Sequence, residues 1–196
     1  RKIIITGASR GIGRATACKL AKQGDHIVIN YFRNKEAALE TAAMVEKKGA
    51  IARIVQANVR SEKDLKVLAA TFDSVDLLIH NAAIGALKPM DKMRSNQWDL
   101  TIESSLRPFW LLTKLCTLSE GAQVIGLSSL GSRLFTPGYA AMGAAKAGME
   151  ALTRQLAVEL SPRKIRVNTV IPTWMWGPPV QGYVQSTAET RGISEA

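Results

Sequence analysis

Apolar residues occur in short, nearly continuous runs rich in Ile and Val, and longer segments with a helical period separate these runs. Such runs are typical of parallel strands that helices cover on both faces. The pattern predicts strands over residues 2–6, 26–30, 52–56, 77–80, 123–128 and 166–170. It predicts helices over residues 13–23, 35–48, 61–71, 95–118 and 138–160. We therefore expect an α/β fold with a Rossmann-type, doubly wound parallel sheet.

The pattern changes near the C-terminal end of the chain. After Pro172, residues 174–179 read Trp-Met-Trp-Gly-Pro-Pro, which predicts a bulky loop, and the residues that follow are mostly polar. The 196 residues are enough for one domain with a substantial core. We expect residues 1–196 to form this single domain, with residues 173–196 as a loop or lid followed by a tail.

Composition favours a soluble protein. Hydrophobic residues make up 46% and charged residues 21%, and no apolar run approaches the roughly 20 residues of a membrane-spanning helix, so we expect no membrane partner. The sequence shows no apolar region followed by a small-residue cleavage site, so we expect a cytoplasmic location. Cys18 and Cys116 lack the spacing of a metal site, so we expect reduced thiols and no metal.

The net charge of +10 comes from 26 basic and 16 acidic residues and favours anionic partners, such as phosphorylated cofactors, acidic carrier proteins or nucleic acid. The basic residues are scattered, as on solvated helix faces; after the N-terminus they are adjacent only at Lys47-Lys48 and Arg163-Lys164. No zinc-finger, basic-zipper or aromatic RNA-binding pattern accompanies them, so no nucleic acid is expected.

A glycine pattern with the spacing G-x-x-x-G-x-G follows the first predicted strand and opens a predicted helix. Glycines allow a tight turn there, and the backbone N–H groups at the helix start can bind a pyrophosphate. A glycine-rich turn can be purely architectural, but its position between an apolar strand and a helix favours dinucleotide binding. The predicted cofactor contacts in this loop are Gly7, Ser9, Arg10, Gly11, Ile12 and Gly13.

The end of the second predicted strand bears on the choice of nucleotide. An acidic residue there would bind the ribose 2′-hydroxyl of NAD, whereas a basic residue accommodates the 2′-phosphate of NADP. Here the strand ends in Asn-Tyr-Phe and then Arg33, with no acid, and Arg10 supplies a second cation. The alternative is that Arg33 is an ordinary exposed loop residue, but Arg10 and the missing acid together favour NADPH over NADH.

Further motifs follow these two in order along the chain, and together they resemble the short-chain dehydrogenase/reductase family over residues 2–174. The motifs are Thr6-Gly7-x-x-x-Gly11-x-Gly13, Asn58-Val59, Asn81-Ala82-Ala83, Ser128-Ser129, Tyr139 with Lys146, and Val-Asn-Thr-Val-Ile-Pro at residues 167–172. The resemblance implies that Asn58 and Val59 lie at the adenine and Asn81 and Ala82 beside the ribose. It also implies that Ile171 and Thr173 lie near the nicotinamide.

One departure from the family pattern concerns the catalytic tyrosine. The common pattern Tyr-x-x-x-Lys would place it at position 142, which is Met142. Tyr139 precedes Lys146 by seven residues, close to two whole turns, so both can share a helix face about 10 Å apart. Tyr-x-x-Met-x-x-x-Lys resembles the enoyl-thioester reductase branch of the family. Ser105, where ketoreductases usually carry asparagine, points the same way.

Two longer stretches are especially similar to the NADPH-dependent bacterial enoyl-acyl-carrier-protein reductases. They are residues 30–42 and the run Ser-Ser-Leu-Gly-Ser at residues 128–132. Reduction of an enoyl thioester creates an enolate oxygen, to which Tyr139 can donate its proton. The Lys146 ammonium would bind the nicotinamide ribose and lower the pKa of Tyr139. Ser129 would orient the substrate oxygen or cap a loop, and His80 is expected to be structural.

Three hypotheses follow for residues 1–196 as a dinucleotide-binding reductase domain. The first is NADPH-dependent reduction of a trans-2-enoyl thioester on acyl carrier protein or coenzyme A. The second is a 3-ketoacyl or carbonyl reductase or an alcohol dehydrogenase, and the third is a catalytically lapsed, cofactor-binding scaffold. The resemblance also implies a homodimer or homotetramer that pairs through the helices 95–118 and 138–160. It implies a further strand beside strand six, which we expect residues 1–196 to lack.

Overall fold

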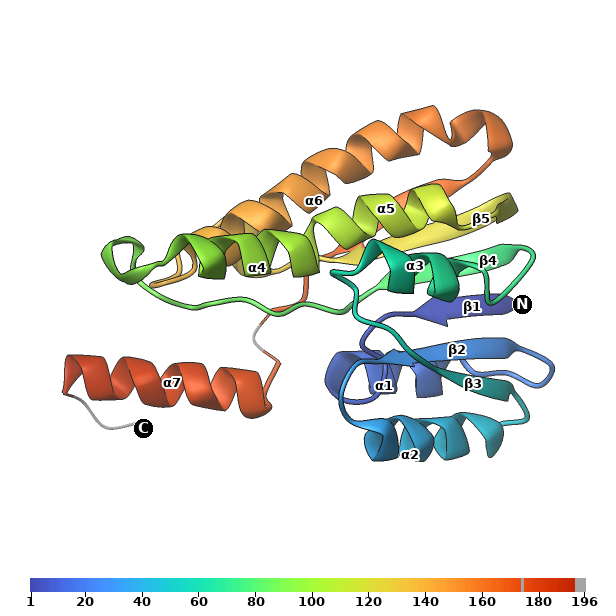
Figure 1. Ribbon diagram of the computed structural model, residues 1–196, viewed down its shortest axis with the longest axis horizontal. Coiled ribbons are helices and arrows are strands. Elements are labelled where there is room, and N and C mark those ends of the chain that lie inside the picture. Colours follow the sequence, from blue (N-terminus) through green and yellow to red (C-terminus); the bar gives the residue numbers. More distant parts are fainter. Residues whose placement is uncertain (174, 193–196) are drawn as a thin grey trace.

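Six parallel strands form one sheet in this computed structural model, which describes residues 1–173 and 175–192 (Figure 1). The strands are β1 (Lys2–Ile5), β2 (His26–Tyr31), β3 (Ile51–Gln56), β4 (Val75–His80), β5 (Leu118–Leu127) and β6 (Arg166–Val170). Their order is β3-β2-β1-β4-β5-β6, and every neighbouring pair is parallel. The expected Rossmann-type sheet is confirmed, and its order reverses between β1 and β4, where ligands bind in such folds.

Helices cover both faces of the sheet. They are α1 (Gly11–Leu20), α2 (Lys35–Glu46), α3 (Glu62–Ala69), α4 (Ser95–Ser105), α5 (Arg107–Leu115) and α6 (Ala140–Glu159), while α7 (Pro178–Arg191) lies apart from the sheet (Figure 1). Alternate residues of β1 belong to two separate apolar clusters. Ile4 packs with residues of α3, α5 and α6, whereas Ile3 and Ile5 pack with residues of α1 and α2. A run of three isoleucines is therefore buried on both faces, as a central parallel strand requires.

The single helix expected over residues 95–118 is wrong. The structure has two helices, α4 and α5, which are separated at Leu106, and residue 118 already begins β5. Pro108 lies in the first turn of α5 and has no N–H to donate to the carbonyl four residues before it, so the series of helical hydrogen bonds is interrupted there. The apolar period of the two helices runs across the break, which is why the pattern alone suggested one.

The polar tail expected near the C-terminal end is also wrong in part, because residues 178–191 form α7. The helix ends at Gly192, whose φ of 63° suits a glycine C-cap. The hydroxyl of Tyr183 donates a hydrogen bond to the carbonyl of Pro137 (3.3 Å), so α7 contacts the loop that precedes α6. Trp174 and residues 193–196, which also belonged to the expected lid and tail, lie outside the described residues.

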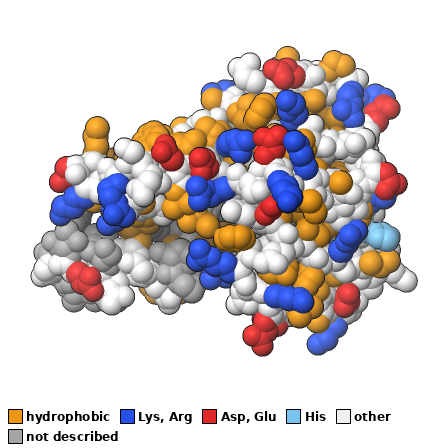
Figure 2. Space-filling model, in the orientation of Figure 1, with side chains coloured by type: hydrophobic (Ala, Val, Ile, Leu, Met, Phe, Trp, Pro, Cys, Tyr) orange, Lys and Arg blue, Asp and Glu red, His pale blue; other side chains and the backbone are white. Residues whose placement is uncertain are grey.

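Within the described residues β6 pairs only with β5, so it forms one edge of the sheet. No described helix has the length and apolar character that crossing a membrane requires. On the face shown in Figure 2, Lys and Arg side chains are dispersed among other residues rather than gathered in one band. This distribution is the one expected when basic side chains lie on solvated helix faces.

Candidate active site

The glycine loop between β1 and α1 has the shape that a pyrophosphate requires. Gly7 and Gly11 have φ values of 61° and 55°, which favour glycine. A Cβ on Gly13 would lie 2.4 Å from the carbonyl oxygen of Gly7, so no side chain fits there. The amides in the first turn of α1 have no helical acceptor, and that turn has no acidic residue. This donor set fits an anionic group, and it includes Gly11, Ile12 and Gly13.

Two asparagines, one near the end of β2 and one directly after β4, hold this loop in place. The N–H of Gly7 donates to Oδ1 of Asn30 (3.1 Å), and Nδ2 of Asn81 donates to the carbonyls of Thr6 and Gly7 (3.0 Å each). The amide of Gly7 is thus used within the protein, and the groups left to face a phosphate lie further along, from Ser9 to Gly13. Sequence reasoning missed Asn30, although a polar residue at the end of an apolar strand was a signal.

His80 connects the same loop to α4. Its Nε2 lies 2.9 Å from the carbonyl oxygen of Ser105. A carbonyl oxygen can only accept a hydrogen bond, so Nε2 must carry the hydrogen and donate it. Nδ1 therefore has no hydrogen and accepts from the hydroxyl of Thr6 (3.1 Å). The Thr6 oxygen accepts in turn from the amides of Asn81 and Ala82. Burial, with a smaller effect of the Lys146 charge, lowers the pKa of His80 to about 3. His80 is therefore neutral and structural rather than a base.

The two arginines predicted to select NADPH are both exposed. Arg10 is the N-cap residue of α1, and the guanidinium of Arg33 lies over the ring of Phe32, 5.5 Å from its centre. Neither has an ion-pair partner among the described residues. Arg14, which sequence reasoning missed, is committed to the fold through Ser9, Ala37, Thr41 and Glu40. Of these three arginines, only Arg10 and Arg33 remain available to bind a phosphate.

The other predicted cofactor residues follow the carboxyl ends of strands. Asn58 and Val59 follow β3, where the amide of Asn58 donates to Asp64 (2.8 Å) and Val59 is buried. Ala82 packs against Gly7, since a Cβ on Gly7 would lie 3.0 Å from its Cα. Ile171 and Thr173 follow β6, partly buried and exposed respectively. All of these positions lie at the edge of the sheet where ligands bind in doubly wound folds.

Tyr139 and Ser129 form a hydrogen-bonded pair after β5. Tyr139 is the N-cap residue of α6, and its hydroxyl donates to Oγ of Ser129 (2.8 Å). The ring lies against Gly131, where a Cβ would come within 2.4 Å of Cδ1 of Tyr139. Burial raises the pKa of Tyr139 and outweighs the opposite effect of the Ser129 hydrogen bond. The phenol is therefore protonated at neutral pH and can donate a proton.

Lys146 lies two turns further along α6 and is only 5% exposed. Its Nζ donates to the carbonyl of Leu127 (2.6 Å), the last residue of β5, and burial lowers its pKa to about 8. The structure thus brings Ser129, Tyr139 and Lys146 to the carboxyl end of β5. The expectation that Lys146 lowers the pKa of Tyr139 is wrong for this arrangement, in which burial raises it.

Met142 fills the position of the tyrosine in the common family pattern. It is 8% exposed, and its Sδ accepts a hydrogen bond from the hydroxyl of Ser105 (3.8 Å). A Cβ on Gly85 would lie 2.3 Å from Cε of Met142, so the loop after β4 passes close over the methionine. The two departures noted in the sequence, Met142 and Ser105, therefore contact each other. Sequence reasoning missed Gly85.

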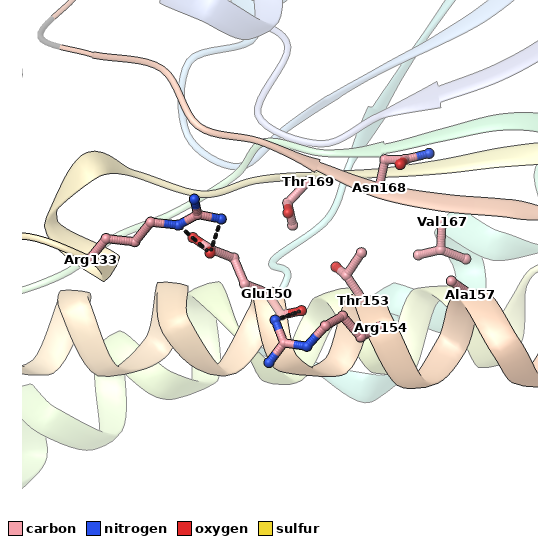
Figure 3. A pocket seen from close by; sticks show the side chains of 8 residues that line it. All are labelled: Arg133, Glu150, Thr153, Arg154, Ala157, Val167, Asn168 and Thr169. Atoms are coloured by element: carbon pink, nitrogen blue, oxygen red, sulfur yellow. Dashed lines mark hydrogen bonds and ion pairs between the residues drawn. The ribbon is translucent and has the colours of Figure 1, made fainter.

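A pocket of about 320 Å³ lies between α6 and β6 (Figure 3). Its lining residues are Arg133, Glu150, Thr153, Arg154, Ala157, Val167, Asn168 and Thr169. In Figure 3 Arg133 extends from the loop after β5 to the carboxylate of Glu150. Sequence reasoning missed Glu150. Its one signal in the sequence was its position four residues after Lys146, which places an acid on the buried side of the predicted helix. No group of acidic, His or Cys residues in the described ranges could hold a metal ion.

Comparison with known proteins places the chain among reductases. The model of the family described as Enoyl-(Acyl carrier protein) reductase matches residues 7–194. A 1-cyclohexenylcarbonyl-CoA reductase of Streptomyces collinus is 38% identical over 176 residues, or 85% of this chain and 62% of the relative. A 3-oxoacyl-(acyl-carrier-protein) reductase of Staphylococcus aureus is 33% identical over 180 residues, or 88% and 73%. The chain thus spans about two thirds of the length of these relatives.

A solved structure shows the same fold together with a nucleotide. An angucycline C-6 ketoreductase with bound NADP superposes with a TM-score of 0.83 at 27% identity. The superposition covers 88% of this chain and 72% of the ketoreductase.

Proposed function

Because the chain belongs to the short-chain dehydrogenase/reductase family of NAD(P)-dependent oxidoreductases, we propose that it uses NADPH to reduce a trans-2-enoyl thioester. The thioester is carried on acyl carrier protein or coenzyme A. The observation that carries the proposal is the position of the phenol: Tyr139 contacts Ser129, and Met142 occupies the site of the usual tyrosine.

Tyr139 lies three residues before the usual position of the tyrosine, and this displacement suits the geometry of an enoyl thioester. In carbonyl reduction the hydride and the proton go to two bonded atoms. In an enoyl thioester the hydride goes to the β-carbon, while negative charge develops on the thioester oxygen, three bonds away. The donor must then lie further from the carbon that receives the hydride. Three residues of helix amount to about 4.5 Å of axial rise, which is the order of the offset along α6 between positions 139 and 142.

The side chains of the site have distinct tasks in this reaction. Tyr139 donates a hydrogen bond to the thioester oxygen as charge develops on it, and this stabilises the enolate. Ser129 holds the phenol in position before the substrate arrives. Lys146, with a pKa of about 8, is mainly an ammonium at neutral pH and binds the nicotinamide ribose hydroxyls. NADPH supplies the hydride when bound, and a saturated thioester results once the α-carbon takes up a proton.

The choice of NADPH rests on charge. Arg10 and Arg33 are exposed cations at the glycine loop and after β2, and no acid follows β2 to bind a ribose 2′-hydroxyl. The angucycline ketoreductase holds NADP, which supports the same choice.

Reduction of a 3-oxoacyl thioester is a second candidate, and a specific observation favours it. The Staphylococcus aureus relative is a 3-oxoacyl reductase and the solved structure is a ketoreductase, so most of the named relatives reduce ketones. The Streptomyces collinus relative and the description of the matching family favour enoyl reduction. The names support ketoreduction more strongly, whereas the positions of Tyr139 and Met142 support enoyl reduction.

A parallel assay separates these candidates. NADPH oxidation is followed with a trans-2-enoyl and a 3-oxoacyl thioester of the same chain length, on both coenzyme A and acyl carrier protein. We expect turnover of the enoyl thioester and its loss, by at least about 100-fold, in Tyr139→Phe. Turnover of the 3-oxoacyl thioester alone overturns the proposal. NADPH binding measured by calorimetry without turnover of either substrate identifies a scaffold.

We also propose that the protein is a homodimer or homotetramer. The support is apolar surface on the helices that were expected to pair: Trp98 and Trp110 are 40% and 42% exposed, and Val158 is 73% exposed. Sedimentation at micromolar concentration tests this, and a monomer there contradicts it.

A further inference from the structure

Glu150 is a buried acid on α6, four residues after Lys146, and it is only 8% exposed. Three side chains donate to its carboxylate. The hydroxyls of Ser128 and Ser132 lie 2.6 and 2.5 Å from Oε1, and Nε of Arg133 lies 3.0 Å from Oε2. The second nitrogen of the Arg133 guanidinium completes an ion pair at 2.9 Å. The carboxylate is therefore bound on both oxygens.

The three donors belong to one short segment, residues 128–133, which leaves β5 and forms the 3₁₀ turn η2 (Leu130–Ser132). Glu150 accepts hydrogen bonds from the first residue of this segment, Ser128, and from its last two residues, Ser132 and Arg133. The hydroxyl of Ser132 also lies 2.7 Å from the carbonyl of Ser129 and can give its single hydrogen to either that carbonyl or Glu150, so Ser132 lies between the carboxylate and the residue that contacts Tyr139. One carboxylate thus holds both ends of the segment that carries Ser129.

The same segment forms the surface against which Tyr139 packs. Gly131 lies so close to the Tyr139 ring that a Cβ would come within 2.4 Å of it. The carbonyl of Gly131 lies against the first turn of α6, where a Cβ on Gly143 would come within 2.8 Å. A shift of η2 would therefore move both partners of the hydrogen bond between Tyr139 and Ser129.

Lys146 binds the residue that precedes the segment. Its Nζ donates to the carbonyl of Leu127, and Glu150 accepts from the next residue, Ser128. Two residues one turn apart on α6 therefore hold two consecutive residues at the end of β5. The position of Lys146 and the position of the 128–133 segment are set by the same stretch of helix.

A carboxylate at a buried position is costly unless donors offset the loss of water. Burial alone would raise the pKa of Glu150, but the hydrogen bonds from Ser128 and Ser132 and the charge of Arg133 lower it overall. The group is thus ionised at neutral pH, and its hydrogen bonds are charge-assisted, which makes them stronger and more directional than neutral ones.

We infer that Glu150 is a positioning residue, which fixes the 128–133 segment against α6 and thereby sets the geometry of the pair formed by Tyr139 and Ser129. It acts on the reaction through these two residues. The inference rests on the proposed role of Tyr139 as the donor, and its test includes a measurement that does not depend on turnover.

The variant Glu150→Gln keeps the shape of the side chain but removes its charge, so it can no longer accept from all three donors. We expect kcat to fall by about tenfold, while the dissociation constant for NADPH changes by less than about twofold. Glu120→Gln is the matched control, because Glu120 pairs with Lys164 (2.6 Å) near the opposite end of β5. We expect the control to match the unmodified protein in kcat.

The effect should disappear when the donor is removed. In a Tyr139→Phe background, Glu150→Gln should lower the remaining rate by less than about twofold, since a positioning residue has nothing left to position. Ser132→Ala removes one of the three donors and should lower kcat in the same direction by a smaller factor. If Glu150→Gln does not fold, Ser132→Ala in both backgrounds decides the question. An effect that is undiminished in Tyr139→Phe overturns the inference.

A titration of the Tyr139 phenol provides the measurement without turnover. The ultraviolet difference between each protein and its Tyr139→Phe counterpart isolates this phenol from the two other tyrosines. Loosening the segment in Glu150→Gln reduces both the burial of Tyr139 and its hydrogen bond to Ser129; because burial has the larger effect, the pKa should fall, and Glu120→Gln should leave it unchanged. An unchanged pKa in Glu150→Gln overturns the inference. If neither thioester is reduced, the proposed function fails and this titration still decides the role of Glu150.

Discussion

Replacement of Lys146 by methionine should stabilise the protein while it removes the reductase activity. The side chain is 5% exposed, and burial lowers its pKa from the ordinary value of 10.5 to about 8. At 1.36 kcal/mol for each pKa unit, keeping the ammonium charged inside the protein costs about 3 kcal/mol at neutral pH. Methionine has a similar length and no charge, so the substitution removes this cost.

One interaction opposes the gain. The ammonium donates to the carbonyl of Leu127 (2.6 Å), and the loss of a hydrogen bond from a charged group costs about 1.5 kcal/mol. The expected net stabilisation is thus about 1 to 2 kcal/mol at pH 7. In a protein of this size, that corresponds to a rise of about 2 to 8 °C in the melting temperature.

The measurement is a pair of urea or thermal unfolding curves for both proteins between pH 7 and pH 10. The folded pKa of Lys146 lies below its unfolded value, so the unfolded chain binds more protons between about pH 8 and pH 10.5. Within this window the unmodified protein regains stability as the pH rises, and the advantage of Lys146→Met should shrink. NADPH binding by calorimetry should weaken at every pH.

Two results would refute the reasoning. A less stable Lys146→Met protein at pH 7 would mean that the ammonium contributes more through its contacts than its burial costs. A stability difference that stays constant between pH 7 and pH 10 would mean that the lysine does not titrate in this window. Lys164→Met is the control: Lys164 lies on the surface, where its stability effect should be small at all pH values.

Two further predictions concern the nucleotide loop. Gly13→Ala places a Cβ 2.4 Å from the carbonyl oxygen of Gly7, so we expect NADPH binding to weaken by at least about tenfold in calorimetry and stability to fall by about 1 to 3 kcal/mol. Gly182→Ala, where a Cβ meets nothing within 4 Å, is the control, and similar behaviour of both variants would contradict the prediction. Arg33→Ser should raise the KM for NADPH by about tenfold and leave that for NADH nearly unchanged, with the exposed Arg53→Ser as control; an equal rise for both nucleotides would remove Arg33 from the 2′-phosphate site.

The sheet and the glycine loop could be predicted because their signals are local. A strand covered on both faces needs a continuous apolar run, and Ile3, Ile4 and Ile5 form one whichever helices cover them. A tight turn that leads into a helix needs glycine wherever φ is positive, as at Gly7 and Gly11. Neither requirement depends on distant residues, and the structure confirmed the predicted sheet.

The boundaries of helices were harder to predict, because a helix can end without a change in its apolar period. The break at Leu106 follows from Pro108, but the residues on both sides of it remain amphipathic, so the pattern continued through the break. The segment 178–191 has a weak apolar period, and its helix contacts the rest of the protein through Tyr183 and Pro137. Contacts of this kind lie outside any local window of sequence.

The sequence alone determined the fold class and the family. It also singled out Tyr139, Ser129 and Lys146 as candidate catalytic residues, because their spacing resembles a family pattern. The tertiary structure decided what surrounds them. It buried Lys146 and thereby lowered its pKa, and it placed Glu150 where three side chains of the 128–133 segment meet. The physical reason is that burial and hydrogen bonding depend on which segments meet in space, and this is settled only when α6 packs against the end of β5.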